Sequence, residues 1–399
     1  MGEFVTNRKR IPTLDYIKGF GIILIAIYHI VYRSMDGIPD KMIRSLGWAY
    51  IGIFFLLSGF TGRQESGIKE SYRRRVKGLL LPVVLMELLL LFLGGIYCMI
   101  FHKYSISDVI HDSLVTFLRP EITTRIAARS AAAWGDGGTL FFNLSPVWFI
   151  WTMVWTELFF HPLRHLVMGR GTKAWIALQV VLLGIQVPMY VFLKPAPWGL
   201  TVLPTYLMFM MIGVKLREWN VLERLDRLRL SRAIPISIAC LAAHFGLFLF
   251  NGNESYYVSK FGNRGALDVF TVILQVVIIF PALYTLARCV GKFRWLALVL
   301  EWYGKHTLTV LLMHCLIALV YSDLLGVYCK PGSLWYLELA DIPLTFEIIA
   351  KSSLSCLLAL LTCIPMTILW EKLERVAFRK KPKKKQTDSG RGEAPGKKK

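Results

Sequence analysis

Residues 14–33 read LDYIKGFGIILIAIYHIVYR, and this stretch decides the fold class. An apolar run of about 20 residues is long enough for a helix to cross the hydrocarbon core of a bilayer. Between its charged ends the run carries only two basic side chains, Lys18 and His29. Eleven residues make about three helical turns, so the sequence predicts a transmembrane helix with both side chains on one face, about 16 Å apart along its axis.

Comparable apolar runs follow along most of the chain. Only 18% of the 399 residues are charged and 55% are hydrophobic, whereas soluble proteins carry about a quarter charged residues. We predict an all-α, polytopic membrane protein with about ten transmembrane helices around a central cavity. The expected spans are roughly 14–33, 44–62, 78–100, 146–160, 174–193, 200–216, 233–251, 268–287, 305–325 and 346–370.

The basic charge is distributed in a way that predicts the topology. With the N-terminus inside, most of the 47 Lys and Arg residues fall in the inner segments, as the positive-inside rule requires. Both termini are therefore expected in the cytoplasm of a multi-pass cell-membrane protein. The net charge of +21 is assigned to topology and to contacts with anionic membrane lipid, and no nucleic-acid partner is expected.

Two domains and one long loop are expected. Residues 1–372 form the transmembrane domain, and residues 373–399, rich in Lys, Gly and Pro, form a disordered basic cytoplasmic tail. Residues 101–145 form the longest outer loop, of a length that is usually functional or disordered. The seven Cys residues are scattered without a CxxC pair, so neither a metal site nor a disulfide framework is predicted.

Ionisable groups inside a span are costly and usually face an interior cavity. Lys18 and His29 are therefore candidate functional residues, although each also has a structural explanation: a lysine reaching the interface, and a hydrogen-bonded core histidine. Arg73, Arg74, Arg75 and Lys77 precede the third span. Such a run is usually a topology signal, but guanidinium groups at a helix N-terminus also suit phosphate binding.

Several other polar groups lie within or beside spans, and each alone is best explained as a structural hydrogen-bond partner. No pair of these residues forms a motif that fixes a reaction. They are Glu87, Trp148, Glu157, His161, His244, His306 and His314.

The order of the local sequences is more informative. RIPTLDYIKGFGIILIAIYH (10–29) resembles the first-span signature of the acyltransferase-3 family of membrane acyltransferases, including its basic-x10-His spacing from Lys18 to His29. Further similar segments occur in the family's order: FFLLSGF (54–60), YRRRVKGLLLP (72–82), SPVWFIWTMVWTEL (145–158), YLMFMMIGVKL (206–216) and YGKHTLTVLLMH (303–314).

The resemblance implies an O-acyltransferase that moves an acyl group, usually acetyl, from cytoplasmic acyl-coenzyme A to a hydroxyl of an extracytoplasmic or lipid-linked glycan. Acetyl-CoA is then a co-substrate and no metal is involved. His29 would be the catalytic base or a transient acyl carrier. Lys18, Arg73, Arg74, Arg75 and Lys77 would hold the donor phosphates, and Trp148, Glu157 and His314 would contact the acceptor.

One departure from the family pattern and two alternatives accompany this interpretation. The second basic position of the family's Arg-x-x-Arg turn is Lys77, which lacks the guanidinium fork. A transporter or flippase for a lipid-linked sugar would use the same cavity, but it would tolerate partial loss of His29 and bind no coenzyme A. As a third hypothesis, the chain is a scaffold in an envelope-synthesis complex.

Overall fold

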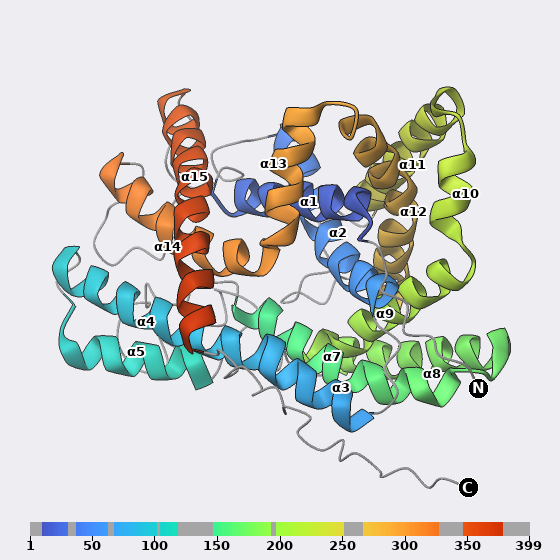
Figure 1. The fold of residues 1–399 in the computed structure, drawn as a ribbon, viewed down its shortest axis with the longest axis horizontal. Helices are drawn as coiled ribbons and strands as arrows, with labels where there is room; N and C mark the ends of the chain where they lie inside the picture. Colours follow the sequence, from blue (N-terminus) through green and yellow to red (C-terminus); the bar gives the residue numbers. More distant parts are fainter. Residues whose placement is uncertain are drawn as a thin grey trace, which may run out of the picture.

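The computed structural model describes residues 10–30, 37–62, 68–101, 104–118, 147–192, 197–250, 266–326 and 346–377. Throughout these ranges the regular structure is helical (Figure 1). Nine stretches within them are long and apolar enough to cross a membrane. The predicted all-α membrane fold is confirmed.

Ten long helices correspond in order to the ten predicted spans. They are α1 (Pro12–Ile30), α2 (Gly37–Thr61), α4 (Leu81–Phe101), α7 (Val147–Val167), α8 (Gly171–Phe192), α9 (Leu203–Glu218), α11 (Leu230–Phe250), α12 (Ala266–Val290), α14 (Thr307–Leu324) and α15 (Phe346–Ala377). Only α7 is missing from the nine apolar stretches, because its second half carries charged and imidazole groups. Residues 373–377 of the predicted 373–399 tail belong to α15, and the rest of the tail, from residue 378, lies outside the described residues.

Shorter helices occupy segments that the sequence left as loops. They are α3 (Ile68–Arg75), the π-helix η2 (Val76–Leu80), α5 (Ile106–Leu118), the 3-10 helix η4 (Pro197–Val202), α10 (Val221–Arg227) and α13 (Arg294–Lys305). In α13 the buried residues Ala297, Leu300, Tyr303 and Gly304 recur at helical spacing. This apolar face packs against α1. Residues 288–305, which fall between two predicted spans, are therefore largely part of the bundle.

The basic segment before the third span is itself helical. Helices α3, η2 and α4 form one continuous run, in which the Leu81 N–H donates to the carbonyl of Val76. Pro82 has no N–H for the carbonyl of Gly78, which accounts for the wider π turn here. Arg73 to Lys77 therefore lie inside a helix. The expectation that they surround a helix N-terminus, with its unpaired N–H groups, is wrong.

Glycines bring two pairs of helices into backbone contact. A Cβ at Gly59 of α2 would lie 1.9 Å from the carbonyl oxygen of Met210, and one at Gly213 of α9 would lie 2.0 Å from that of Leu56. Gly19 of α1 meets Leu300 of α13 in the same way, also at 1.9 Å. Small residues allow such approach between membrane helices. Here they hold α2 against α9 and α1, which carries His29, against α13.

We expect Gly59→Ala to lower the thermal stability of the detergent-solubilised protein by the equivalent of about 1–3 kcal/mol, because the new methyl group would overlap backbone rather than a flexible side chain. Melting followed by intrinsic fluorescence measures this change. Gly246→Ala in α11 is the matched control, since no atom lies within 4 Å of its added Cβ. Equal melting temperatures for both variants would contradict the close α2–α9 contact.

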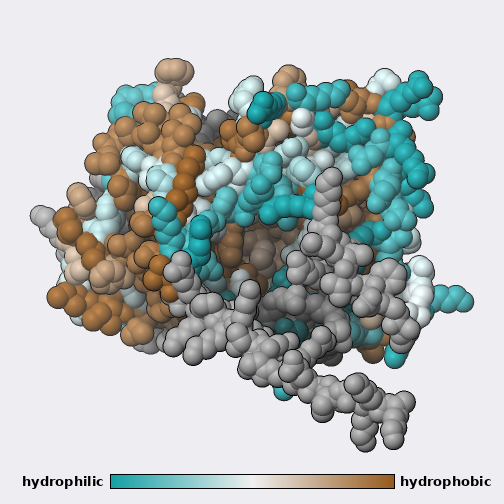
Figure 2. Space-filling model, viewed as in Figure 1, coloured by the Kyte–Doolittle hydropathy of each residue, from teal (hydrophilic) through white to brown (hydrophobic). Residues whose placement is uncertain are grey.

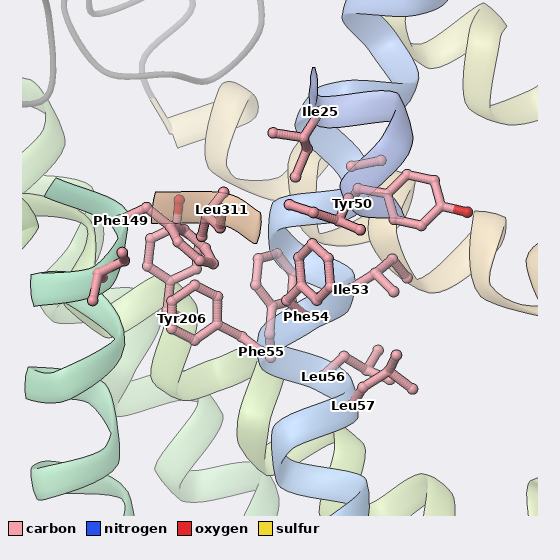
Figure 3. Close-up of a cluster of buried hydrophobic side chains, with 14 of the residues drawn as sticks. Ile25, Tyr50, Ile53, Phe54, Phe55, Leu56, Leu57, Phe149, Tyr206 and Leu311 are labelled. Carbon is pink, nitrogen blue, oxygen red and sulfur yellow. The ribbon is translucent and has the colours of Figure 1, made fainter. Parts of the chain in front are cut away.

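An aromatic core lies at the centre of α2 (Figure 3). Phe55 stacks on Tyr206 of α9 with ring centroids 4.1 Å apart, and it meets Phe149 of α7 edge-on at 5.5 Å. Ile25 of α1 and Leu311 of α14 belong to the same buried cluster. Ile25 precedes His29 by four residues and Leu311 precedes His314 by three, so the core holds the helical turns that carry both histidines.

The outer surface is apolar where lipid is expected. Large exposed hydrophobic side chains occur on α4, α8, α11 and α15, among them Phe92, Val180, Ile238 and Leu357. Figure 2 shows apolar residues over the part of the molecule formed by α4, α5 and α15, with hydrophilic residues gathered near α10 and α11. Such an exposed apolar surface fits a protein embedded in hydrocarbon.

Candidate active site

Two histidines that are 285 positions apart in the sequence meet inside the bundle. Nδ1 of His29 on α1 lies 2.9 Å from Nε2 of His314 on α14. The two imidazole rings are stacked, with centroids 5.2 Å apart and an interplanar angle of 15°. His314 is fully buried, whereas His29 is half-buried. His314 was predicted to contact the acceptor; the structure places it directly against His29.

The hydrogen bonds of the pair define its tautomers. Nδ1 of His314 lies 3.0 Å from the carbonyl oxygen of Val310, and a carbonyl only accepts, so the proton of neutral His314 is on Nδ1. Its Nε2 then carries a lone pair and accepts the N–H of His29 Nδ1. Neutral imidazole has one protonated nitrogen, so the basic lone pair of His29 lies on Nε2. The assignment follows from this hydrogen-bond chain.

A cysteine completes the cluster. Sγ of Cys315 lies 3.3 Å from Nε2 of His314 and 3.9 Å from Nδ1 of His29. Cys315 is only 4% exposed. Sequence reasoning missed this residue because a single cysteine in an apolar run usually packs as a small hydrophobe. Its position directly after His314 was the one available signal.

Lys18 lies on the same helix as His29, and α1 is continuous between them. The predicted spacing of about 16 Å along the axis therefore holds. Lys18 is half-buried, one turn from Asp15, whose carboxylate accepts the Nε–H of Arg10 at 2.5 Å. Outside the span, this contact raises the pKa of Arg10. The two candidate residues thus sit toward opposite ends of α1.

Glu157 of α7 lies toward the end of α2 that is remote from His29. Gly47 of α2 packs against Tyr28, the neighbour of His29. Ser58, eleven residues and about 16 Å further along α2, donates its hydroxyl to Oε1 of Glu157 at 3.2 Å. The Glu157 carboxylate, predicted to contact the acceptor, is thus far from His29 and close to the basic segment that precedes α4.

The basic residues before α4 differ in their surroundings. Nη2 of Arg75 lies 3.3 Å from Oε2 of the buried Glu157. Arg73 and Lys77 are exposed. The side chains of Arg74 and Trp148, predicted to bind donor and acceptor, lie outside the described residues. Arg75 therefore neutralises a buried carboxylate, and Arg73 and Lys77 are the described members of the segment that face the surroundings.

A pocket of about 980 Å³ opens where α7 and α9 end and α8 begins. Arg217 at its edge donates to the carbonyls of Phe60 and Gly62, which holds the end of α2. Of the predicted donor-binding residues whose side chains the structure describes, none lines this pocket. Its charged lining is balanced between cations and carboxylates: Arg164, Lys215, Arg217, Glu218, Glu223 and Asp226.

Comparison with known proteins gives one match. A family model described as an acyltransferase domain matches residues 11–370, which include both histidines, Cys315 and the basic segment before α4. No curated protein and no solved structure matches the chain.

Proposed function

Because the chain belongs to the acyltransferase-3 family, we propose that it moves an acetyl group from cytoplasmic acetyl-CoA to a hydroxyl of an extracytoplasmic or lipid-linked glycan. The family membership supports acyl transfer by a membrane enzyme. The donor, the acceptor and the sidedness are parts of the proposal: the donor and the sidedness rest on the site geometry and on the charge pattern of the chain, and the glycan acceptor rests on the family resemblance.

The observation that carries the proposal is the hydrogen-bond chain from His29 through His314 to Val310. A general base must present its lone pair to the reacting group in a fixed direction. In serine hydrolases an acidic side chain performs this orienting role by accepting the Nδ1–H of the catalytic histidine. Here Nε2 of His314 accepts it, so His314 acts as a positioning residue and Nε2 of His29 as the base.

The proposed step is a direct acyl transfer. Nε2 of His29 takes the proton of the acceptor hydroxyl while the hydroxyl oxygen attacks the carbonyl carbon of the thioester. The C–S bond then breaks, and the coenzyme A thiolate leaves and takes the proton from the imidazolium. Atoms and charge balance without a redox partner, and the products are an ester and free coenzyme A.

In this proposal the donor phosphates bind at the opposite end of α1 from His29. Lys18, Arg73 and Lys77 would meet them there, and the extended pantetheine arm would cover the distance of about 16 Å to the imidazole. Arg75 would contribute indirectly, through its ion pair with Glu157. Because the nearby pocket has a balanced charged lining, it supplies no comparable excess of positive charge.

We expect the double variant Arg73→Ala, Lys77→Ala to raise the KM for acetyl-CoA roughly tenfold, because charge-assisted bonds to phosphate are lost. Its kcat and melting temperature should stay near the wild-type values, since both side chains are exposed. The control is Lys292→Ala, Arg294→Ala, which removes two exposed cations at the start of α13. An equal rise in KM for both double variants would remove the donor-site assignment.

The function itself is tested by supplying radiolabelled acetyl-CoA to membranes of a deletion strain that re-expresses the chain. These membranes contain the natural acceptor, whatever its structure. Label should appear in ester linkage on membrane glycan, in proportion to the amount of the protein. Label that stays in acetyl-CoA, with the protein folded and inserted, would overturn the proposed function.

A further inference from the structure

We propose that His29, His314 and Cys315 form a Zn²⁺ site, and that occupation of this site switches off the proposed acyl transfer. The two parts have different foundations. Metal binding rests on the geometry of three side chains. Inhibition rests in addition on the proposed function, in which His29 is the base.

The three donor atoms have the spacing of a tetrahedral centre. Nδ1 of His29, Nε2 of His314 and Sγ of Cys315 all lie within 4.8 Å of one another. Zinc bonds of about 2.05 Å to nitrogen and 2.3 Å to sulfur, at tetrahedral angles, require N···N near 3.4 Å and N···S near 3.6 Å. The observed N···N distance is 2.9 Å, and the two N···S distances are 3.3 Å to His314 and 3.9 Å to His29. The N···N distance would have to widen by about 0.5 Å, and the two rings, which now face each other along one hydrogen bond, would have to turn so that both nitrogens point at the ion.

The surroundings of His314 also fit a metal ligand. A coordinating histidine commonly donates its second ring N–H to a backbone carbonyl, which fixes the tautomer and the ring orientation. Nδ1 of His314 has this bond, to Val310. Imidazole and thiolate together favour a borderline-soft cation such as Zn²⁺ over Mg²⁺ or Ca²⁺. Three protein ligands leave the fourth position for water.

Metal binding would remove the base by moving one proton. In the metal-free site His29 carries its proton on Nδ1 and its lone pair on Nε2. Coordination through Nδ1 requires that nitrogen to be unprotonated, so the neutral ring must carry its proton on Nε2. The Cys315 thiol also releases its proton, because the thiolate is the ligand. Zinc-bound His29 then presents an N–H where the acceptor hydroxyl needs a lone pair.

The binding part is tested with Co²⁺, which reports thiolate ligation by a charge-transfer band. Wild-type protein in detergent should bind one Co²⁺ with this band, and added Zn²⁺ should displace it. Cys315→Ser should lose the band and bind more than about 100-fold more weakly, because even second-shell changes cost 10–100-fold. Cys98→Ser, which removes another buried thiol, should keep it. No band in the wild-type protein, or an unchanged band in Cys315→Ser, would overturn the site.

The inhibition part is measured as the ratio of acetyl transfer with and without Zn²⁺ in each variant, so differences in basal rate do not enter. Zn²⁺ should inhibit the wild type and Cys98→Ser reversibly, with recovery on addition of a chelator. It should inhibit Cys315→Ala and Cys315→Ser only at much higher concentration. If Co²⁺ bound but Zn²⁺ did not inhibit, the metal site would stand and the proposed inhibition would be refuted. If the chain transferred no acetyl group, the Co²⁺ band would still decide the site.

Discussion

Replacement of His29 by glutamine is expected to lower acetyl transfer by at least about a hundredfold, the usual contribution of a positioned base. Glutamine keeps a polar side chain of similar length but has no basic lone pair at this position. The loss should appear in kcat, whereas the KM for acetyl-CoA should change little, because the proposed phosphate site is at the other end of α1. Initial rates of ester formation in membranes measure the effect.

His165→Gln is the control for this experiment, because it replaces another partly buried histidine, in the last turn of α7. It should retain transfer. Transfer by His29→Gln at the wild-type rate would remove the catalytic assignment. A partial loss of glycan translocation, without any consumption of acetyl-CoA by the wild type, would instead favour the transporter reading.

Replacement of His314 by phenylalanine is expected to lower kcat roughly ten- to a hundredfold, which corresponds to the loss of a hydrogen bond worth about 1–3 kcal/mol. Phenylalanine fills the space but cannot accept the Nδ1–H of His29, so the His29 tautomer and ring orientation are no longer fixed. Steady-state kinetics with acetyl-CoA should show an unchanged KM.

A merely structural role for His314 would give a different result. His314→Gln offers an amide oxygen near the position of Nε2 and should recover a substantial part of the lost kcat. Melting temperatures of the two variants should be measured alongside, since His314 is fully buried. Equal loss in both variants, in proportion to lost stability, would contradict the positioning role.

The helices were largely predictable from the sequence because each has a local cause. Long apolar runs predicted all ten long helices, and the Lys18–His29 spacing holds because α1 is continuous. Smaller helices were missed where an amphipathic segment packs on the bundle, as α13 does against α1. The basic residues 73–77 were expected to surround the N-terminus of the third span, although nothing between Ile68 and Pro82 interrupts a helix, and the structure continues the helix through them.

The site was less predictable, because it depends on contacts between distant segments. Sequence reasoning selected both His29 and His314, yet it could not pair them, since their meeting requires the packing of α1 against α14. The surroundings of Glu157 likewise depend on helix packing. Glu157 lies beside Ser58 and Arg75 because α2 runs antiparallel to α1 and because α3 packs on α7. Local residue patterns reveal neither of these arrangements.

The most direct test of the central claim, acyl transfer to a surface glycan through His29, is mass spectrometry of cell-envelope glycans. A deletion strain should lose glycan species heavier by one acyl group. Wild-type chain should restore them, and a His29→Gln chain inserted at the same level should not. Identical glycan profiles in the parent, the deletion strain and both complemented strains would contradict the account.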